Sequence, residues 1–183
     1  LDINQDKLEI IKNSGGILWT YECSDNAKHQ SPLGYYRGQS WLAWHHGLTG
    51  IGFWSYCTSQ ADPWYKPEGT MDYLLVYQGD GVVPSKRWEA VRDGIEDYDM
   101  LAALRNAARK AKDENRSPEA VAKAETLLKD TAFQVARFCG LDEDGTTPGK
   151  DGLSGVRTVE DRRHGLIQTV RREIAQLLVQ LAP

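Results

Sequence analysis

Residues 79–98 read GDGVVPSKRWEAVRDGIEDY. The two glycines on either side of Asp80 predict a turn, because glycine adopts backbone conformations that other residues avoid. Ser85 has the side chain of a good N-cap, and apolar residues then recur three or four positions apart, which indicates a helix. Those apolar positions are Trp88, Val91, Ile95, Tyr98, Leu101 and Leu104. The stretch therefore predicts a turn that leads into a long helix.

Upstream of this turn, short apolar runs alternate with polar loops. Residues 6–13 have the pattern of a helix end, and residues 34–46 are compatible with a short helix. Residues 17–21 and 50–56 are rich in β-branched and aromatic side chains and predict two strands. Residues 73–77 predict a third short strand or an extended arm. Glycines within the second strand indicate that another part of the protein approaches it closely.

The chain changes character near residue 100, because all six Trp and all eight Tyr precede it. Downstream, Ser117 and Pro118 form a favourable helix start, and this helix is expected to run to about Cys139. After a loop rich in Gly and Asp, residues 158–161 resemble a capping box with Asp in place of Glu. An apolar stripe then predicts a last helix; it consists of Leu166, Ile167, Val170, Ile174, Leu177, Leu178 and Leu181.

Composition and charge exclude several classes of partner. The 183 residues are 40% apolar and carry 26 acidic against 22 basic side chains, a formal charge of −4. We therefore expect no nucleic-acid partner, which would favour a basic face. No apolar run approaches the roughly 20 residues that cross a bilayer, so we expect no membrane partner. The chain starts at Leu1 without Met or a signal-peptide pattern, and we expect that residues upstream of it are missing.

Cysteine and histidine spacing gives no support for a metal or redox site. Cys23, Cys57 and Cys139 form no Cys-x-x-Cys pair. A disulfide between Cys23 and Cys57 is one alternative, and two buried thiols on neighbouring strands is the favoured one. The adjacent His45 and His46 would point about 100° apart on a helix and cannot easily share a metal. We expect no metal and no cofactor.

Charged residues after Ser85 are spaced for pairing along the helix. Glu89 and Arg92 lie three positions apart, and Arg92 and Glu96 four, which favours a structural role. Asp97 diverges from the adjacent Glu96 around the helix and would make a poor catalytic pair with it. Acidic neighbours accompany a group of arginines and predict a solvated helix face; these are Arg157, Arg162, Arg163, Arg171 and Arg172.

The expected strands are too few to form a complete sheet. Parallel strands need partners along both edges and cover on both faces. Two or three strands cannot close a barrel, which takes eight strands and about 250 residues in the common enzyme form. We therefore expect strands on the N-terminal side that this chain does not contain, and a tendency of the chain to associate through exposed apolar edges. The alternative is a complete small α+β domain whose sheet the C-terminal helices cover.

The motif around residues 79–98 resembles the closing segment of glycoside hydrolase family 123 and its relatives. That segment has a Gly-Asp-Gly turn and a helix of the form Ser-x-Arg-x-Glu-x-x-Arg-Asp-Gly-x-Glu-Asp-Tyr, and every fixed position is matched here. The aromatic strand that ends near Tyr21, Arg37 before a Trp-rich helix, and residues 50–56 fit as well, so the resemblance covers about residues 15–105. Departures are Pro84 directly before the cap and Glu22, where many relatives have a small polar residue.

The resemblance implies a (β/α)-barrel and a retaining exo-glycosidase that acts on terminal N-acetylgalactosamine. The family uses the acetamido oxygen of the substrate as nucleophile and an adjacent Asp-Glu pair on an earlier strand. Asp-Glu occurs here only at residues 113–114 and 142–143, and neither pair follows a buried strand. The catalytic pair is therefore expected upstream of this chain. The implied partner is a carbohydrate, and a secreted or periplasmic location is typical of glycosidases.

Glu22 is the one carboxylate at a predicted strand end with aromatic neighbours, Trp19 and Tyr21. Barrel enzymes place catalytic groups where strands end, and glycosidases need carboxylates beside the scissile bond. We therefore name Glu22 as the candidate catalytic residue of this chain, with Trp19 and Tyr21 as candidate sugar-binding residues. The alternative for Glu22 is a loop-edge side chain in solvent.

Further aromatic residues are candidates for stacking on the apolar C–H face of a sugar. Trp54 and Tyr56 would share one face of the second strand, being two positions apart; core packing is the alternative for Trp54. Trp64 lies in the next predicted loop, where barrel enzymes build binding sites. Arg87, near the helix start, is the basic residue best placed to reach a pocket.

These observations predict an α/β fold, the C-terminal portion of a (β/α)8 (TIM-like) barrel followed by a helical segment. Residues 1–112 would be the last βα units, and residues 113–183 a C-terminal segment of two helices. The predicted function is that of part of a glycoside hydrolase, inactive alone because it lacks the catalytic pair. The alternative is a non-catalytic carbohydrate-binding or structural domain.

Overall fold

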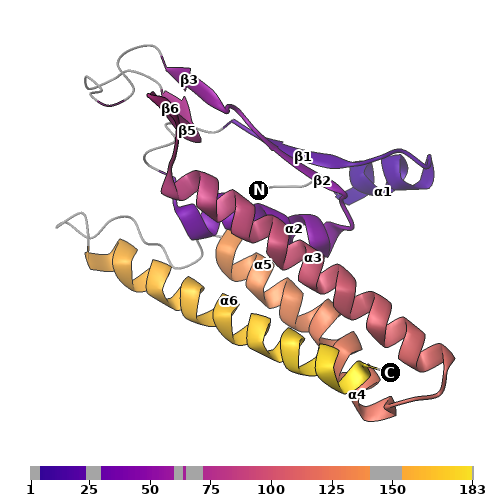
Figure 1. Cartoon of the computed structure of the whole chain (residues 1–183). Coiled ribbons are helices and arrows are strands. Elements are labelled where there is room, and N and C mark those ends of the chain that lie inside the picture. Colours follow the sequence, from indigo (N-terminus) through magenta and orange to yellow (C-terminus); the bar gives the residue numbers. More distant parts are fainter. Residues whose placement is uncertain (1–4, 24–29, 60–63, 65–71, 141–153, 183) are drawn as a thin grey trace.

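Helix α3 (Lys86–Asp113), predicted from the motif after Ser85, runs through the middle of the protein (Figure 1). The computed structural model describes residues 5–23, 30–59, 64, 72–140 and 154–182. The Ser85 hydroxyl accepts hydrogen bonds from the backbone N–H groups of Arg87 and Trp88, at 3.1 and 3.3 Å. The predicted N-cap is therefore confirmed, because the hydroxyl satisfies two of the donors that a helix start leaves unpaired.

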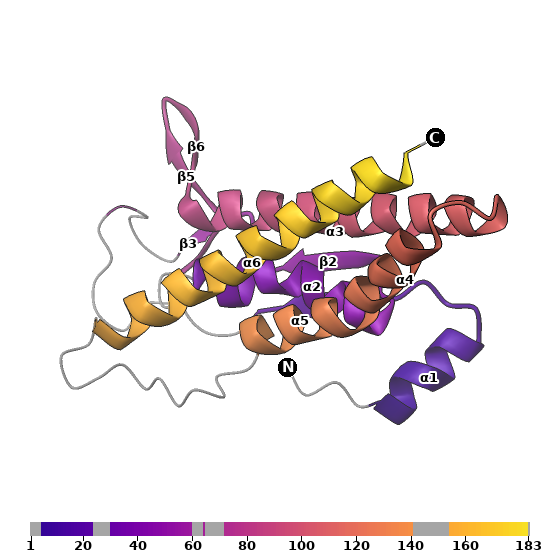
Figure 2. The ribbon, with the colours of Figure 1, turned by 90° about the horizontal axis from the view of Figure 1, so that it is seen from below.

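The other helices form two layers with α3 (Figures 1 and 2). The strands lie on one side of α2 and α3, and α4, α5 and α6 lie on the other side. The elements are α1 (Gln5–Asn13), the π-helical segment η1 (Pro32–Arg37), α2 (Gly38–His46), α4 (Pro118–Thr126), the π-helical segment η2 (Leu127–Thr131), α5 (Ala132–Gly140) and α6 (Ser154–Leu181).

Two predicted helix starts are wrong in detail. Helix α4 begins at Pro118 as expected, but the Ser117 side chain does not cap it. Ser117 has a left-handed backbone, with φ of 47°, and its hydroxyl donates instead to the carbonyl of Gln180 at 3.4 Å. Helix α6 begins at Ser154, so the predicted capping box at residues 158–161 lies inside the helix. At Ser117 a contact with α6 takes the hydroxyl, and at residues 158–161 the helix simply begins earlier than the local pattern indicated.

The largest buried cluster joins residues from before and after position 112. It includes Trp41 of α2, Leu101 and Leu104 of α3, and the apolar stripe of α6, from Ile167 to Leu181. Helix α6 packs against α3, α4 and α5 (Figure 2). The predicted stripe on the last helix is therefore confirmed as core, while the boundary at residues 112 and 113 stays a prediction.

The strands β1 (Trp19–Glu22) and β2 (Gly50–Phe53) pair in parallel, with α2 in the connection between them. This βα order is the predicted one, and each strand is shorter than predicted. Strand β1 starts at Trp19 rather than at residue 17, and β2 ends at Phe53. Residues 54–56 therefore lie beyond the strand in which they were placed.

The predicted third strand is divided into two. Strand β4 (Asp72–Leu74) pairs antiparallel with β3 (Cys57–Ser59), and β5 (Val76–Gly79) forms a hairpin with β6 (Gly81–Pro84). The predicted turn around Asp80 is confirmed as the tip of this hairpin, where Gly81 has a φ of 144°. The described strands form three two-stranded sheets. The fold is thus a mixed helix and strand arrangement, and the barrel itself stays a prediction.

A buried ion pair joins α3 to the segments packed around it. Asp97 of α3 is fully buried and accepts hydrogen bonds from Nε and Nη2 of Arg37, at 2.7 and 2.9 Å. The indole Nε1 of Trp41 donates to the same carboxylate at 2.9 Å, and Nη1 of Arg171 in α6 at 2.6 Å. Burial acts to lower the pKa of Arg37, but the hydrogen bond and charge of Asp97 outweigh it, so the pKa is raised.

Arg163 makes a second link between α6 and η1. Its guanidinium lies 3.0 Å from Glu160 Oε1 and donates to the Phe138 carbonyl at 3.3 Å. Ser31, directly before η1, hydrogen-bonds to Glu160 as well. The prediction that Arg163 and Arg171 lie on a solvated helix face is therefore wrong, because Arg163 is buried and Arg171 pairs with Asp97 of α3.

Close approach between α3 and η1 depends on Gly94. A Cβ atom at this position would lie 2.9 Å from the Arg37 carbonyl oxygen and 2.9 Å from Ser40 Oγ. The absent side chain lets α3 approach the backbone that presents Arg37. The glycine of the motif therefore helps the Arg37–Asp97 pair to form.

The cysteines fit neither of the two alternatives. All three thiols are free, so the disulfide between Cys23 and Cys57 is not formed. Cys23 is exposed and Cys57 half-buried, so the alternative of two buried thiols is wrong too. Cys139 is buried, and this burial raises the pKa of its thiol to about 12.

Replacing Asp97 by Asn should lower the free energy of unfolding by about 3–5 kcal/mol, because it leaves the buried charge of Arg37 without its partner. Urea titration followed by circular dichroism measures this difference. Asp93→Asn is the matched control: its carboxylate is 37% exposed and lies 3.4 Å from Arg37, so the loss should stay below about 1 kcal/mol. Equal losses in the two variants would contradict the assignment of Asp97 as the central partner.

The three thiols should react in the order of their exposure. At pH 8 a disulfide reagent should label Cys23 first and Cys139 only after unfolding, because a buried thiol of raised pKa holds almost no thiolate. Mass mapping of the labelled peptides in native buffer and in urea checks this. Labelling of Cys139 as fast as of Cys23 would show that its position in the core is wrong.

Candidate functional site

Two exposed aromatic rings lie on the face of the β1–β2 sheet that no described helix covers. Along β1 the side chains alternate, so Trp19 and Tyr21 are 69% and 59% exposed while their neighbours are buried. Their partners in register on β2 are Gly50 and Gly52. A Cβ at Gly50 would lie 2.5 Å from the Trp19 ring, and one at Gly52 would lie 3.3 Å from Cδ2 of Tyr21. The glycines therefore give the two rings room to lie across β2; we call this surface the open face.

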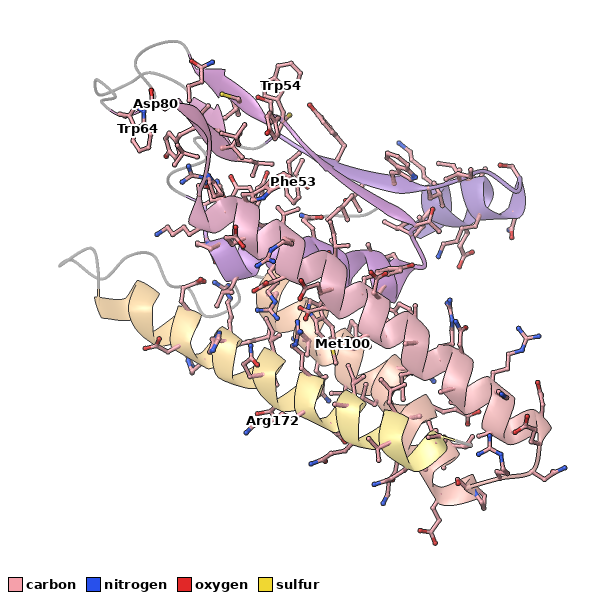
Figure 3. The ribbon with its side chains drawn as sticks, in the orientation of Figure 1. Phe53, Trp54, Trp64, Asp80, Met100 and Arg172 are labelled. Atoms are coloured by element: carbon pink, nitrogen blue, oxygen red, sulfur yellow. The ribbon has the colours of Figure 1, made fainter. Side chains whose placement is uncertain are left out.

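The opposite face of the sheet packs on the helices. Thr20 is buried and donates to Oε1 of Gln39 in α2 at 3.3 Å. Phe53 packs against the ring of Tyr36 in η1, with ring centroids 5.2 Å apart. Figure 3 shows Phe53 on the side of the sheet that faces α3. One face of the parallel pair is thus core, and the other is open.

Glu22 belongs to the covered face. It is only 8% exposed, and the Tyr35 hydroxyl donates to its Oε2 at 3.2 Å. The alternative of a Glu22 in solvent is therefore wrong. The alternation of the strand also separates Glu22 from Trp19 and Tyr21, which point to the other side. The structure thus does not bring the three candidates into one pocket, and a catalytic role for Glu22 stays a prediction.

Trp54 and Tyr56 lie just past the C-terminal end of β2, and both are exposed. The backbone N–H of Trp54 donates to the Glu22 carbonyl at 2.8 Å, which places Trp54 beside the end of β1. Core packing, the alternative for Trp54, is not what the structure shows. The ring of Tyr56 meets Trp88 edge to face, with centroids 5.8 Å apart. The predicted common strand face fails here because β2 has already ended.

Trp64 and Arg87 form a separate group at the β5–β6 hairpin, together with Tyr77. Trp64, labelled in Figure 3, is 60% exposed. Its ring stacks on that of Tyr77, with ring centroids 4.7 Å apart. Arg87 is buried and donates from Nε to the Leu74 carbonyl at 2.9 Å and from Nη2 to the Tyr77 hydroxyl at 2.7 Å. Arg87 therefore holds the hairpin, and its direct contact with a sugar stays a prediction.

Sequence reasoning missed Tyr35 and Tyr77, which contact two of the candidates. Tyr35 lies 13 residues from Glu22, and Tyr77 lies 10 residues from Arg87, on other elements. No spacing rule within a helix or strand links such positions. Only the aromatic character of the two residues could have suggested them.

The described residues hold no group of three or more side chains able to bind a metal, and no helix among them is both long and apolar enough to cross a membrane. The His45 and His46 rings lie 4.6 Å apart at a steep angle, and His45 packs against Phe133. Partial burial lowers the pKa of both histidines, and the charge of Lys12 adds to this effect. Their surroundings therefore favour the neutral form.

Comparison with protein-family models gives one match that covers more than half of the chain. The model described as "Glycoside hydrolase 123, catalytic domain" matches residues 2–104. The match includes the open face, the hairpin and most of α3. No curated protein sequence and no solved structure matches the chain.

Gly50→Ala should displace the Trp19 ring from β2, because the new methyl group would overlap it. We expect a changed tryptophan signal in near-ultraviolet circular dichroism and a loss of about 1–3 kcal/mol in the free energy of unfolding. Gly52→Ala is the milder control, with a loss below about 1 kcal/mol. In a Trp19→Ala background the cost of Gly50→Ala should disappear. A cost that persists there would show that something other than the ring occupies the space.

Proposed function

The chain belongs to the glycoside hydrolase 123 family, and we propose that it forms the C-terminal part of a sugar-cleaving barrel whose open face contributes to substrate binding. The observation that carries the proposal is that described helices pack on only one face of the β1–β2 sheet. Parallel strands occur almost only in sheets that are covered on both faces. Here helices cover one face, and Trp19 and Tyr21 stand exposed on the other.

The open face is the side on which a barrel would have its interior. In a (β/α) barrel the helices pack on the outside of the strands, and the substrate binds at the C-terminal ends of the strands. Glu22 and Trp54 lie at those ends in β1 and just after β2, joined by a backbone hydrogen bond. We therefore propose that further parallel strands of the same protein pair with this sheet and complete the binding site.

The proposed substrate is a carbohydrate with a terminal N-acetylhexosamine, cleaved with retention. In substrate-assisted cleavage, the acetamido oxygen attacks C1 while an acid protonates the departing oxygen, and water then opens the cyclic intermediate. Trp54 and Tyr56 would stack on the sugar, with Tyr21 near the end of β1 beside them, because rigid aromatic rings fit apolar C–H faces. Trp19, at the start of β1, would line the barrel interior below the sugar. Glu22, held by Tyr35, would accept hydrogen bonds from sugar hydroxyls where the strands end.

Among the described residues, no adjacent Asp-Glu pair lies at the β1–β2 sheet. Residues 113–114 lie at the far end of α3, away from the strands (Figure 1). Residues 142–143 lie outside the described residues. We propose that the catalytic pair is carried by the strands that complete the barrel.

A second candidate is a non-catalytic carbohydrate-binding domain. The observation that favours it is the position of Glu22 on the opposite side of β1 from the aromatic rings. The rings could then bind a sugar with no carboxylate beside the scissile bond.

The decisive experiment compares hydrolysis by this chain with hydrolysis by the same chain lengthened by the residues encoded upstream. The panel is a set of aryl glycosides that includes the β-N-acetylgalactosaminide and the β-N-acetylglucosaminide. We expect turnover only by the lengthened protein, and loss of that turnover when the upstream Asp-Glu pair is replaced by Asn-Gln. Turnover by the 183-residue chain alone would overturn the assignment and make Glu22 the leading acid. Sugar binding without turnover in either protein would favour the second candidate.

A further inference from the structure

The Trp64 ring is exposed and nevertheless held in one orientation. Its Nε1 donates to the carbonyl of Gln78 at 2.9 Å, and one side of the ring stacks on Tyr77 at an interplanar angle of 25°. Most of the side chain, 60%, remains open to solvent. The fixed ring therefore presents a flat, rigid apolar surface to solvent.

Tyr77 is fixed in turn by helix α3. The Arg87 guanidinium lies over the Tyr77 ring, with its carbon 5.5 Å from the ring centroid, and also donates to the hydroxyl. Arg87 reaches back to the Leu74 carbonyl, and Ser85 donates to the Leu75 carbonyl at 2.6 Å. The Trp64–Tyr77 stack is therefore anchored to the start of α3 through Arg87. Such rigidity lowers the entropy lost when a ligand binds.

We propose that this stack is the platform of a carbohydrate subsite on the β5–β6 hairpin, with Trp64 as the contact residue and Tyr77 as its positioning residue. The ligand class rests on the proposed function. Asp80, at the hairpin tip, is exposed and only two residues beyond Gln78, which holds the indole (Figure 3). A pyranose has an apolar C–H face edged by hydroxyl groups. The fixed indole would contact the C–H face, and the Asp80 carboxylate, which is close to it in the chain, would accept hydrogen bonds from the hydroxyl groups.

The test uses the 183-residue chain labelled with 5-fluorotryptophan, in which Trp64→Phe assigns the fluorine signal of Trp64. The chain is titrated with methyl β-N-acetylgalactosaminide and methyl β-galactopyranoside, and with sorbitol as a polyol that lacks a ring. We expect a saturable shift of the Trp64 signal with at least one of the pyranosides and none with sorbitol. Saturation-transfer titrations then give the affinity of each variant.

The variants distinguish the residue that contacts the sugar, Trp64, from the residue that positions it, Tyr77. Trp64→Ala should weaken pyranoside binding about tenfold, which corresponds to about 1.4 kcal/mol of lost stacking and burial. Trp64→Phe should recover part of it. Tyr77→Phe keeps the ring and removes the hydroxyl held by Arg87, so binding should weaken about threefold. Phe133→Ala, which removes an exposed ring on α5, is the matched control and should change nothing.

An unmoved Trp64 signal, or unchanged affinity in Trp64→Ala, would overturn the platform. This result is separable from the hydrolysis experiment, because it measures binding by the chain itself. A shifting Trp64 signal without turnover in the lengthened protein would support the platform and refute the enzyme. Turnover with an unmoved signal would support the enzyme and refute the platform.

Discussion

The buried carboxylate of Asp97 is the constraint on which the rest of the fold depends. A charge removed from water is tolerated only where donors replace its hydration, and here the donors come from η1, α2 and α6. The three segments must be in place together, because displacing any one of them leaves the Asp97 carboxylate and a donor without a hydrogen-bond partner. The same helix, α3, presents Asp97 inward and, at its start, holds the hairpin through Arg87. The core and the support of the β5–β6 hairpin are therefore built on one element.

The helices after the region matched by the family model take part in that constraint. The match ends at residue 104, within α3, whereas Arg171 lies far downstream in α6. Residues 118–181 also supply much of the largest buried cluster. The C-terminal helices are thus packed into the same core as the family segment.

Local signals in the sequence predicted local structure well. The cap at Ser85, the hairpin turn at Asp80 and the stripe on α6 are confirmed, because each depends on neighbours within one turn or one strand. The inward arginines could not be predicted, since a helical spacing shows partners on the same helix and not on another. The cap at Ser117 failed because the nearby end of α6 takes its hydroxyl. The grouping of Glu22 with Trp19 and Tyr21 is different, because the alternation of side chains along a strand, which the sequence itself implies, places Glu22 on the opposite face.

The fit of the two aromatic rings over Gly50 and Gly52 has a consequence for how the sequence can change over time. Position 50 can accept a side chain only if position 19 gives up its large ring, and the same holds more weakly for 52 and 21. The two residues of each pair should therefore change together, although they lie 31 residues apart in the chain. Among relatives, we expect a larger residue at the position of Gly50 only where the position of Trp19 carries a small one.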